Sequence, residues 1–279
     1  MGHSEETGRR MNYSIRPCHT HEELATCVAV QKQIWGYADS EVYPLRLFIN
    51  LTKIGGQVLG AFSSETELVG FVASIPAWHR RRRYYHSLSL GVLPEHENKG
   101  LGKALKLAQR EEAIRHGLNC IEWTFDPLKA KNAFFNLERL GAVSRRYLAD
   151  HYGPVDSKLQ QGLPTDRLMA EWWLESPRVI RALNGKPPRP EGQKIAAEVS
   201  WVSTVSHLAE YNPGRARAVQ QAVREQLQKY FADKLVITGF VKGEMENRYL
   251  LNLETEAELS AGDLEWRRKN ASDFSSHED

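Results

Sequence analysis

The chain has 279 residues, of which 37 are Lys or Arg and 35 are Asp or Glu, so its formal net charge is +2. This near balance gives no global field that would attract nucleic acid or an anionic membrane. With 41% hydrophobic and 26% charged residues, the composition excludes a wholly disordered chain. The three cysteines form no CxxC pair, and no apolar run approaches the ~18 residues of a membrane span. We therefore expect a protein of the reducing cytoplasm without a disulfide framework, a metal site or a membrane anchor.

Changes in composition predict five segments along the chain. Residues 1–10 form a polar leader that lacks the apolar core of a signal peptide. Residues 11–183 form a long block, and residues 184–193 hold three prolines and two glycines, which is typical of a linker. A shorter block covers 194–254, and the acidic, Ser-rich residues 255–279 are expected to be a disordered tail.

Hydrophobic periodicity in the long block predicts alternating strands and helices, with Gly36, Gly117 and Gly141 placed to end the helices. The predicted strands cover 12–16, 57–62, 68–75, 84–93, 119–125, 142–150 and 167–174, and the predicted helices cover 21–35, 99–116 and 130–140. The strands 57–62 and 68–75 form an antiparallel hairpin. This order predicts an α/β (α+β) fold, a mixed sheet covered by helices.

The C-terminal block contains a predicted helix over 213–231 and strands over 235–241 and 248–253. One helix and one hairpin bury too little apolar surface to fold alone. We therefore expect this extension to dock on the first block or to continue its sheet.

The most informative segment runs from Ser87 to Leu105, where a strand leads through Pro94 into a loop and a helix. Gly100 and Gly102 in this loop would let a phosphate approach backbone N–H groups beside the positive end of the helix. A Walker A loop is excluded because Lys103 is followed by alanine. A dinucleotide fingerprint is excluded because Leu105 stands where it needs a small residue, and no βαβ repeat follows.

The loop resembles the acetyl-CoA pyrophosphate loop, Gln/Arg-x-x-Gly-x-Gly/Ala, of the GCN5-related N-acetyltransferase (GNAT) superfamily, and the element order over 11–175 is also similar. The resemblance implies a GNAT-like mixed, mostly antiparallel sheet and acetyl-CoA, or another acyl-CoA, as co-substrate, with no metal. It also implies that the strand positions Leu90 and Val92 pair with pantetheine through their backbone. The loop positions that it implies for the pyrophosphate are Glu97, Asn98, Lys99, Gly100, Leu101, Gly102 and Lys103.

The sequence departs from the family pattern at several of these positions. Glu97 stands where the family usually has Arg or Gln, and Asn98 stands where glycine is frequent. Because the family loop works mainly through backbone N–H groups, changed side chains need not abolish binding, and nearby lysines offset the acidic charge. The helix-start asparagine of the family would fall at Ala130, which leaves Asn132, two residues on, as a weak candidate.

The family's reaction needs a base for the amine and a proton for the leaving thiolate. The family base lies fourteen residues before the first loop glycine, which is His86 here. The alternative is an inert, half-buried histidine. Glu122 is the second candidate base, with a solvated or salt-bridged carboxylate as its alternative. The family's tyrosine acid is replaced by Leu137, so either the thiolate leaves unassisted or Tyr147 or Tyr152 substitutes.

Two runs of arginine have two open interpretations. Arg80–Arg83 forms either a solvated turn or a cationic rim for an acidic group, carried by the acceptor or by a dicarboxylic acyl donor such as succinyl-CoA. The same alternatives hold for Arg145 and Arg146. The pair Trp172 and Trp173 is expected to serve core packing.

Together these observations predict an N-acyltransferase that moves an acetyl or other short acyl group, succinyl included, to a primary amine of a small metabolite such as an amino acid. The alternative is a non-catalytic module that binds acyl-CoA. The expected partner is a small-molecule amine, without nucleic acid or membrane, and a homodimer is an open alternative.

Overall fold

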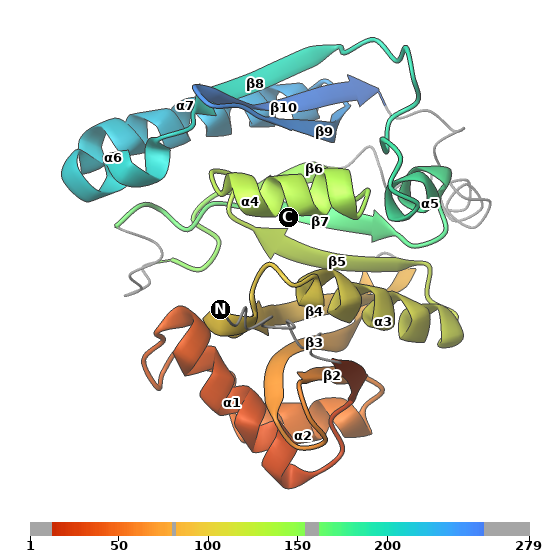
Figure 1. Cartoon of the computed structure of the whole chain (residues 1–279). Helices are drawn as coiled ribbons and strands as arrows, with labels where there is room; N and C mark the ends of the chain where they lie inside the picture. The colour runs from red at the N-terminus through yellow and green to blue at the C-terminus, as the bar shows by residue number, and fades with distance from the viewer. Residues whose placement is uncertain (1–12, 80–81, 154–161, 254–279) are drawn as a thin grey trace, which may run out of the picture. The chain divides into compact units, whose positions relative to one another are not determined.

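The computed structural model describes residues 13–79, 82–153 and 162–253. The predicted leader and tail, together with Arg80 and Arg81, lie outside these residues. The chain divides into two compact units, whose helices and strands are labelled in Figure 1. The first unit comprises the chain up to Ile75 and Leu88–Glu111, and the second comprises Pro76–Ser87 and the chain from Glu112 onward. This division differs from the blocks that the proline-rich linker suggested.

The first unit is built on an antiparallel sheet in which β2 (Gln57–Phe62) pairs with β1 (Ser14–Pro17) and with the beginning of β3 (Leu68–His79). The predicted hairpin of β2 and β3 is therefore confirmed. Helix α1 (His21–Trp35) has the predicted bounds because a Thr20–Glu23 capping box starts it and Gly36, with a φ of 63°, ends it. Helix α2 (Leu45–Lys53) was not predicted from the sequence.

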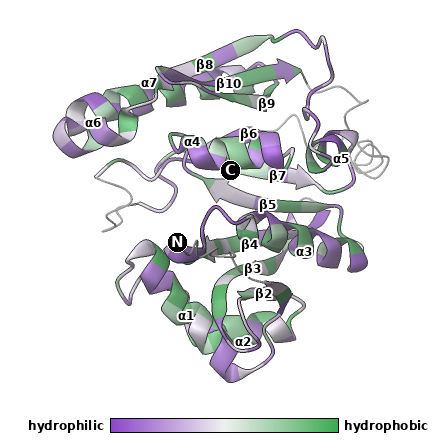
Figure 2. Ribbon diagram, in the orientation of Figure 1, coloured by the Kyte–Doolittle hydropathy of each residue, from purple (hydrophilic) through white to green (hydrophobic). Residues whose placement is uncertain are grey.

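Helices α1, α2 and α3 (Leu101–Arg115) cover this sheet with their apolar faces, and α3 carries both apolar and polar colours in Figure 2. The end of β4 (Arg82–Val92) packs closely on α1. A Cβ atom at Gly91 would lie 2.6 Å from the Cδ1 atom of Ile34, so a larger residue there would force this side chain to shift. This contact fixes the strand that leads into the predicted phosphate loop.

The second unit contains a mixed sheet that is mostly antiparallel. Strand β4 runs parallel to β5 (Cys120–Phe125), and all other neighbours are antiparallel. The order is β4, β5, β7 (Arg167–Trp173), β6 (Val143–Leu148), β9 (Leu235–Lys242), β10 (Glu246–Leu253) and β8 (Ala197–Val202). The predicted fold class is thus confirmed.

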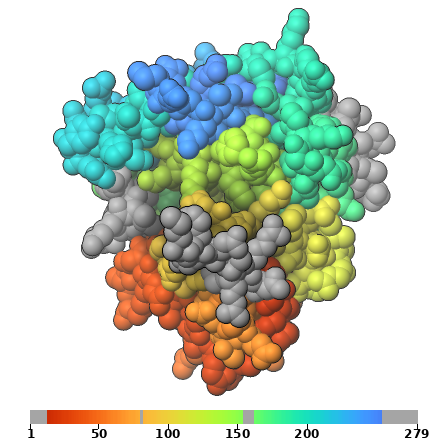
Figure 3. Space-filling view, in the orientation of Figure 1, coloured from red at the N-terminus to blue at the C-terminus, as the bar shows by residue number. Residues whose placement is uncertain are grey.

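The C-terminal extension continues the sheet of the second unit, because Ser144 on β6 pairs with Ile237 on β9. Its helix, α7 (Pro213–Ala232), has nearly the predicted bounds, whereas β8 and α6 (Val205–Tyr211) were not predicted. Figure 3 shows atoms of α4 (Ala130–Phe134) directly beside the blue C-terminal strands, in agreement with the contact between α4 and β9. The extension therefore shares one core with the rest of this unit.

Two further helical segments complete the second unit. The predicted helix over 130–140 divides into α4 and a π-helical turn, η2 (Phe135–Arg139), and α5 (Pro177–Leu183) follows β7. Trp172 and Trp173 are buried, as expected, and the Trp172 indole donates to the backbone oxygen of Leu140 at 2.8 Å. These contacts place η2 against the sheet.

Three general features follow from the described part of the chain. All three cysteines are buried and unbridged. None of the helices within 13–79, 82–153 and 162–253 is long and apolar enough to cross a membrane. The same residues contain no group of three or more His, Cys, Asp or Glu side chains that could hold a metal ion.

Candidate acyl-CoA loop and acid–base residues

The predicted phosphate loop lies between the end of β4 and the start of α3 in the first unit. A short turn, η1 (Pro94–His96), precedes it, and the four residues from Glu97 to Gly100 are exposed. Gly100 has a φ of 83° and Asn98 a φ of 58°, both in the left-handed region. Asparagine is one of the few residues other than glycine that adopts this conformation readily. Asn98 therefore supplies the backbone shape that glycine frequently supplies at this position in the family that the loop resembles.

The two loop glycines leave open space beside the backbone. A Cβ atom at Gly100 would meet nothing within 4 Å, and one at Gly102 would meet only the Cδ2 atom of Leu90 at 3.8 Å. Gly102 has no left-handed φ, so the fold itself does not require glycine there. The missing side chain instead leaves room for an atom of a ligand next to the first N–H groups of α3, which lack acceptors within the helix. This arrangement fits a pyrophosphate.

Contacts on both sides hold this loop in place. The N–H of Leu93 donates to the Val69 oxygen at 2.8 Å, and the Tyr13 hydroxyl lies 3.0 Å from the Nδ1 atom of buried His96. The Lys99 ammonium donates to the backbone oxygen of Glu95 at 2.9 Å. Half-buried Lys103 lies in the first turn of α3 and adds a positive charge there.

A buried polar network lies beneath α3, and the sequence analysis missed it. Lys106 donates to the Oε1 atom of Gln109 at 2.9 Å, Gln109 donates to Ser74 at 2.6 Å, and Ser74 donates to Gln57 at 3.0 Å. All four side chains are at most 3% exposed. Burial lowers the pKa of Lys106 well below its ordinary value. The only sequence signal is that Lys106 and Gln109 are spaced to share one helix face.

In the second unit, the two candidate bases lie on neighbouring strands. His86 on β4 is in register with Glu122 on β5. The preceding pair, Tyr85 and Ile121, belongs to the core on one face of the sheet, so His86 and Glu122 lie on the opposite face. His86 is half-buried, whereas Glu122 is 1% exposed.

Glu122 belongs to a network of ion pairs on this face. It pairs with Arg82 and with Arg146, whose Nη2 atom is 2.7 Å from Oε2 of Glu122. The Nε atoms of Arg145 and Arg146 lie 3.1 and 3.6 Å from the carboxylate of Glu171 on β7. A register shift between Ser144 and Tyr147 accounts for two consecutive arginines reaching one glutamate. We call these five residues, Arg82, Glu122, Arg145, Arg146 and Glu171, the ion-pair network.

The interpretation of the arginine runs as solvated turns is wrong for Arg82. Its side chain is buried, and its guanidinium lies 4.9 Å from the ring centre of Trp173 as well as beside Glu122. The physical reason is the alternation of β4, which turns Arg82 to the same face as His86. Arg83, the next residue, is exposed.

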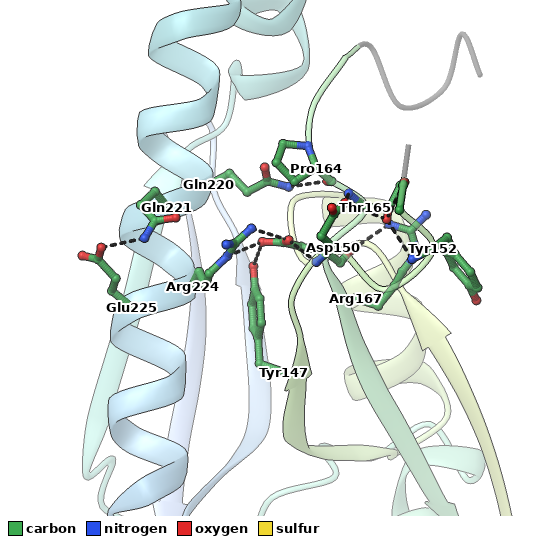
Figure 4. Close-up of polar contacts among 12 residues, drawn as sticks. Tyr147, Asp150, Tyr152, Pro164, Thr165, Arg167, Gln220, Gln221, Arg224 and Glu225 are labelled. Atoms are coloured by element: carbon green, nitrogen blue, oxygen red, sulfur yellow. Dashed lines mark hydrogen bonds and ion pairs between the residues drawn. The ribbon is translucent and has the colours of Figure 1, made fainter. Parts of the chain in front are cut away.

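The structure separates the three candidate proton donors. Leu137 is fully buried in the core. The Tyr147 hydroxyl donates to buried Asp166 at 2.5 Å, and Arg224 of α7 donates to the same carboxylate at 2.6 and 2.9 Å (Figure 4). Burial and the neighbouring carboxylate raise the pKa of Tyr147 far above its ordinary value, which keeps its proton in place.

Tyr152 differs from Tyr147 in exposure and in partner. Its side chain is 52% exposed, and its hydroxyl lies 2.8 Å from the Oγ1 atom of Thr124. Its backbone N–H donates to Thr165 at 2.9 Å, which positions the ring (Figure 4). Thr124 follows Glu122 by two residues on β5 and therefore lies on the same face as His86. Asn132, the weak candidate for cofactor binding, is exposed on α4.

A mixed sheet, with a strand that leads through a loop with two glycines into a helix, is the arrangement that the sequence analysis expected. Comparison with known families agrees, because residues 20–142 match the acetyltransferase (GNAT) family. The part of the chain from 20 to 142, less than half of its length, is thus similar to the GNAT family, whose members transfer an acyl group from acyl-CoA. None of the curated proteins matches the sequence.

Several solved structures are similar to part of the chain. A putative GNAT acetyltransferase from Desulfovibrio desulfuricans is 14% identical, with a TM-score of 0.46, over 58% of this chain and 99% of that chain. The putative acetyltransferase yncA from Salmonella typhimurium, solved with acetyl-CoA, is 18% identical, with a TM-score of 0.46; the match covers 59% of this chain and 95% of that chain. NAA60 from Arabidopsis thaliana, solved with a bisubstrate analogue, is 16% identical, with a TM-score of 0.44; the match covers 58% of this chain and 98% of that chain.

Proposed function

We propose that this protein is an acyl-CoA-dependent N-acyltransferase that moves an acetyl or other short acyl group to the primary amine of a small metabolite. The observation that carries the proposal is the glycine loop before α3, which lies within the segment that matches the GNAT family. Gly100 and Gly102 leave the backbone bare, Asn98 holds the loop in the required shape, and Lys103 adds positive charge. These residues would hold the pyrophosphate of acetyl-CoA or of another acyl-CoA.

His86 is the proposed general base. An amine acceptor is mostly protonated at neutral pH and must lose a proton before its nitrogen attacks the thioester carbon. A histidine side chain changes charge near neutral pH and can accept that proton directly or through one water. His86 is half-buried on β4, the strand that continues into the loop, so it is accessible from solvent while its backbone is fixed.

Glu122 is the weaker of the two candidate bases. Its carboxylate is buried against Arg82 and Arg146, and these positive charges stabilise its ionised form. Accepting a proton would give up both ion pairs inside a buried site, which is costly. We therefore assign Glu122 to the support of this face rather than to proton transfer.

Tyr152 is the proposed proton donor for the thiolate that leaves when the tetrahedral intermediate collapses. The family position for this role holds buried Leu137, and the Tyr147 proton is held by Asp166. The Tyr152 hydroxyl bonds to Thr124 on the face that carries His86. Because its ring is half exposed, water can return the proton after each turnover.

The second candidate function is an acyl-CoA-binding module without catalysis, and the leucine at position 137 favours it. Turnover separates the two functions. Release of free CoA with an amine panel, with the acyl product detected by mass spectrometry, supports the enzyme. Tight binding of acetyl-CoA without product from any amine supports the module.

Replacement of the base tests the mechanism. His86→Ala should lower kcat/KM by about 10²–10⁴, the usual contribution of a general base. The affinity for acetyl-CoA should stay unchanged, and the acidic limb of the pH–rate profile should disappear. His207→Ala, a change at an exposed histidine on α6, serves as the matched control. A loss of less than threefold with an intact acidic limb would exclude His86 as the base.

A further inference from the structure

We propose that Arg146 binds a carboxylate group of the substrate, and that the acceptor is accordingly an amine that also carries a carboxylate, as an amino acid does. The inference rests on the proposed function and names its substrate class. It starts from the ion-pair network, which joins two arginine runs that the sequence left with two interpretations.

The charges of the ion-pair network do not cancel. Three guanidinium groups, from Arg82, Arg145 and Arg146, face the two carboxylates of Glu122 and Glu171. The network therefore carries one net positive charge on a largely buried sheet face. An excess of guanidinium groups on one face favours the binding of an added carboxylate.

The excess charge reaches solvent at Arg146. The side chains of Glu122, Glu171, Arg82 and Arg145 are 1%, 6%, 9% and 18% exposed, whereas Arg146 is 36% exposed. A ligand from solvent would therefore meet Arg146 before the other members. The two glutamates hold its guanidinium from below, which fixes its orientation in advance and lowers the entropic cost of binding.

Arg146 also retains donors for a ligand. A guanidinium has five N–H donors in a planar fork that matches a carboxylate. Its Nη2 atom contacts Glu122 and its Nε atom contacts Glu171. Its Nη1 atom makes no hydrogen bond or ion pair with the described residues. A carboxylate can therefore bind at the outer edge of the fork without displacing either glutamate.

This positive charge lies next to the proposed base. Arg146 binds Glu122 directly, and Glu122 is in register with His86 on the neighbouring strand, about 4.8 Å away between strand axes. All three side chains share one face. A small acceptor with both an amine and a carboxylate could place the carboxylate on Arg146 and the amine at His86.

A carboxylate could also come from a dicarboxylic acyl donor, and the experiment distinguishes the two sources. We would compare the wild type, Arg146→Gln, Arg146→Lys and the control Arg83→Gln, which removes a charge from an exposed position on β4. Each variant is assayed with amino acids and their decarboxylated amines, and with acetyl-CoA and succinyl-CoA. Binding of the same compounds is measured by calorimetry in parallel.

We expect Arg146→Gln to lower kcat/KM for amino acids about 10- to 100-fold, as expected for a hydrogen bond between charged groups. For the decarboxylated amines, kcat/KM of Arg146→Gln should fall less than threefold. Arg146→Lys should recover part of the kcat/KM that Arg146→Gln loses with amino acids. Arg83→Gln should have the same kcat/KM as the wild type with every substrate. If Arg146→Gln lowers turnover of succinyl-CoA with every acceptor, the carboxylate belongs to the acyl donor; this result would support carboxylate binding by Arg146 but would overturn the assignment of the carboxylate to the acceptor.

Equal losses with and without a carboxylate would overturn the inference, because damage to the fold affects both members of each pair alike. If the wild type turns over no amine, the proposed function fails. The calorimetric comparison then still decides about Arg146, since an amino acid or succinyl-CoA should bind the wild type more tightly than Arg146→Gln. Equal affinities there would overturn the inference independently.

Discussion

Replacement of Lys106 by methionine should change how the stability of the protein depends on pH. Lys106 is buried on the inner face of α3, and its pKa is lowered well below the ordinary value because burial disfavours the charged ammonium. Methionine has a similar length and carries no charge, so it can occupy the same space. The substitution also removes the hydrogen bond to Gln109, which shifts the free energy of unfolding by a constant amount.

The sign of the effect follows from proton binding in the two states. Above its lowered folded-state pKa, Lys106 is neutral in the folded protein, whereas in the unfolded chain it stays protonated up to about pH 10.4. Between these limits the unfolded state binds one more proton, so the free energy of unfolding rises with pH. The slope is about 1.4 kcal/mol per pH unit. The penalty for burying Lys106 is complete below the folded-state pKa and vanishes above about pH 10.4.

Urea denaturation between pH 7.5 and 9.5 measures this slope. The fluorescence of Trp35 reports on the first unit, because its ring centre lies 6.2 Å from the ring centre of Phe71 in that unit. The free energy of unfolding of the wild type should rise with pH relative to that of Lys106→Met, by at most about 1.4 kcal/mol per pH unit. Lys53→Met, at an exposed lysine that ends α2, is the control and should run parallel to the wild type. Parallel curves for Lys106→Met and the wild type would show that Lys106 is charged in the folded protein and would refute the reasoning.

Three further predictions concern the loop, the Asp166 cluster and the extension. Gly102→Val should weaken acetyl-CoA binding at least tenfold by calorimetry, or about 1.4 kcal/mol, with an unchanged circular dichroism spectrum. Unchanged affinity would remove the loop from the binding site. Asp166→Asn should lower the free energy of unfolding by about 3 kcal/mol, because it breaks the buried ion pair with Arg224, and a loss below about 0.5 kcal/mol in urea denaturation would contradict this role. Truncation after residue 193 should cause aggregation, seen by light scattering, because β6 loses its neighbour β9, and a monomeric, folded fragment would contradict it.

Local signals in the sequence predicted much of the fold. Helix α1 was predicted with its observed bounds because both ends carry strong signals, a polar residue with a glutamate three positions on and then a glycine. Helix α2 was missed although Pro44 precedes it and Phe48 and Leu51 have helical spacing. Elements such as β8 and α6 have only six or seven residues, too few for periodicity to separate them from loops.

Buried charges were the main part of the site that the sequence could not predict. Periodicity assigns charged residues to solvent, so it gave no reason to place Arg82 or Lys106 in the core. The partners of Arg82 and of Asp166 are 40 and 58 residues away in the chain. Only the folded arrangement of the strands and of α7 shows which opposite charges meet. The bulge in β6, which turns two consecutive arginines toward Glu171, has no sequence signal that we recognise.

In the proposed function, the residue at the family's acid position, Leu137, serves packing, and Tyr152 serves proton transfer. The turn η2 packs this side chain fully into the core, where an unpaired hydroxyl would be costly. The loop after β6 instead brings Tyr152 to Thr124, on the opposite face of β5. That face is determined by the core residues of β5, because Ile121 and Trp123 must point inward. The same alternation that buries them therefore places Thr124, the partner of the Tyr152 hydroxyl, on the face that carries His86.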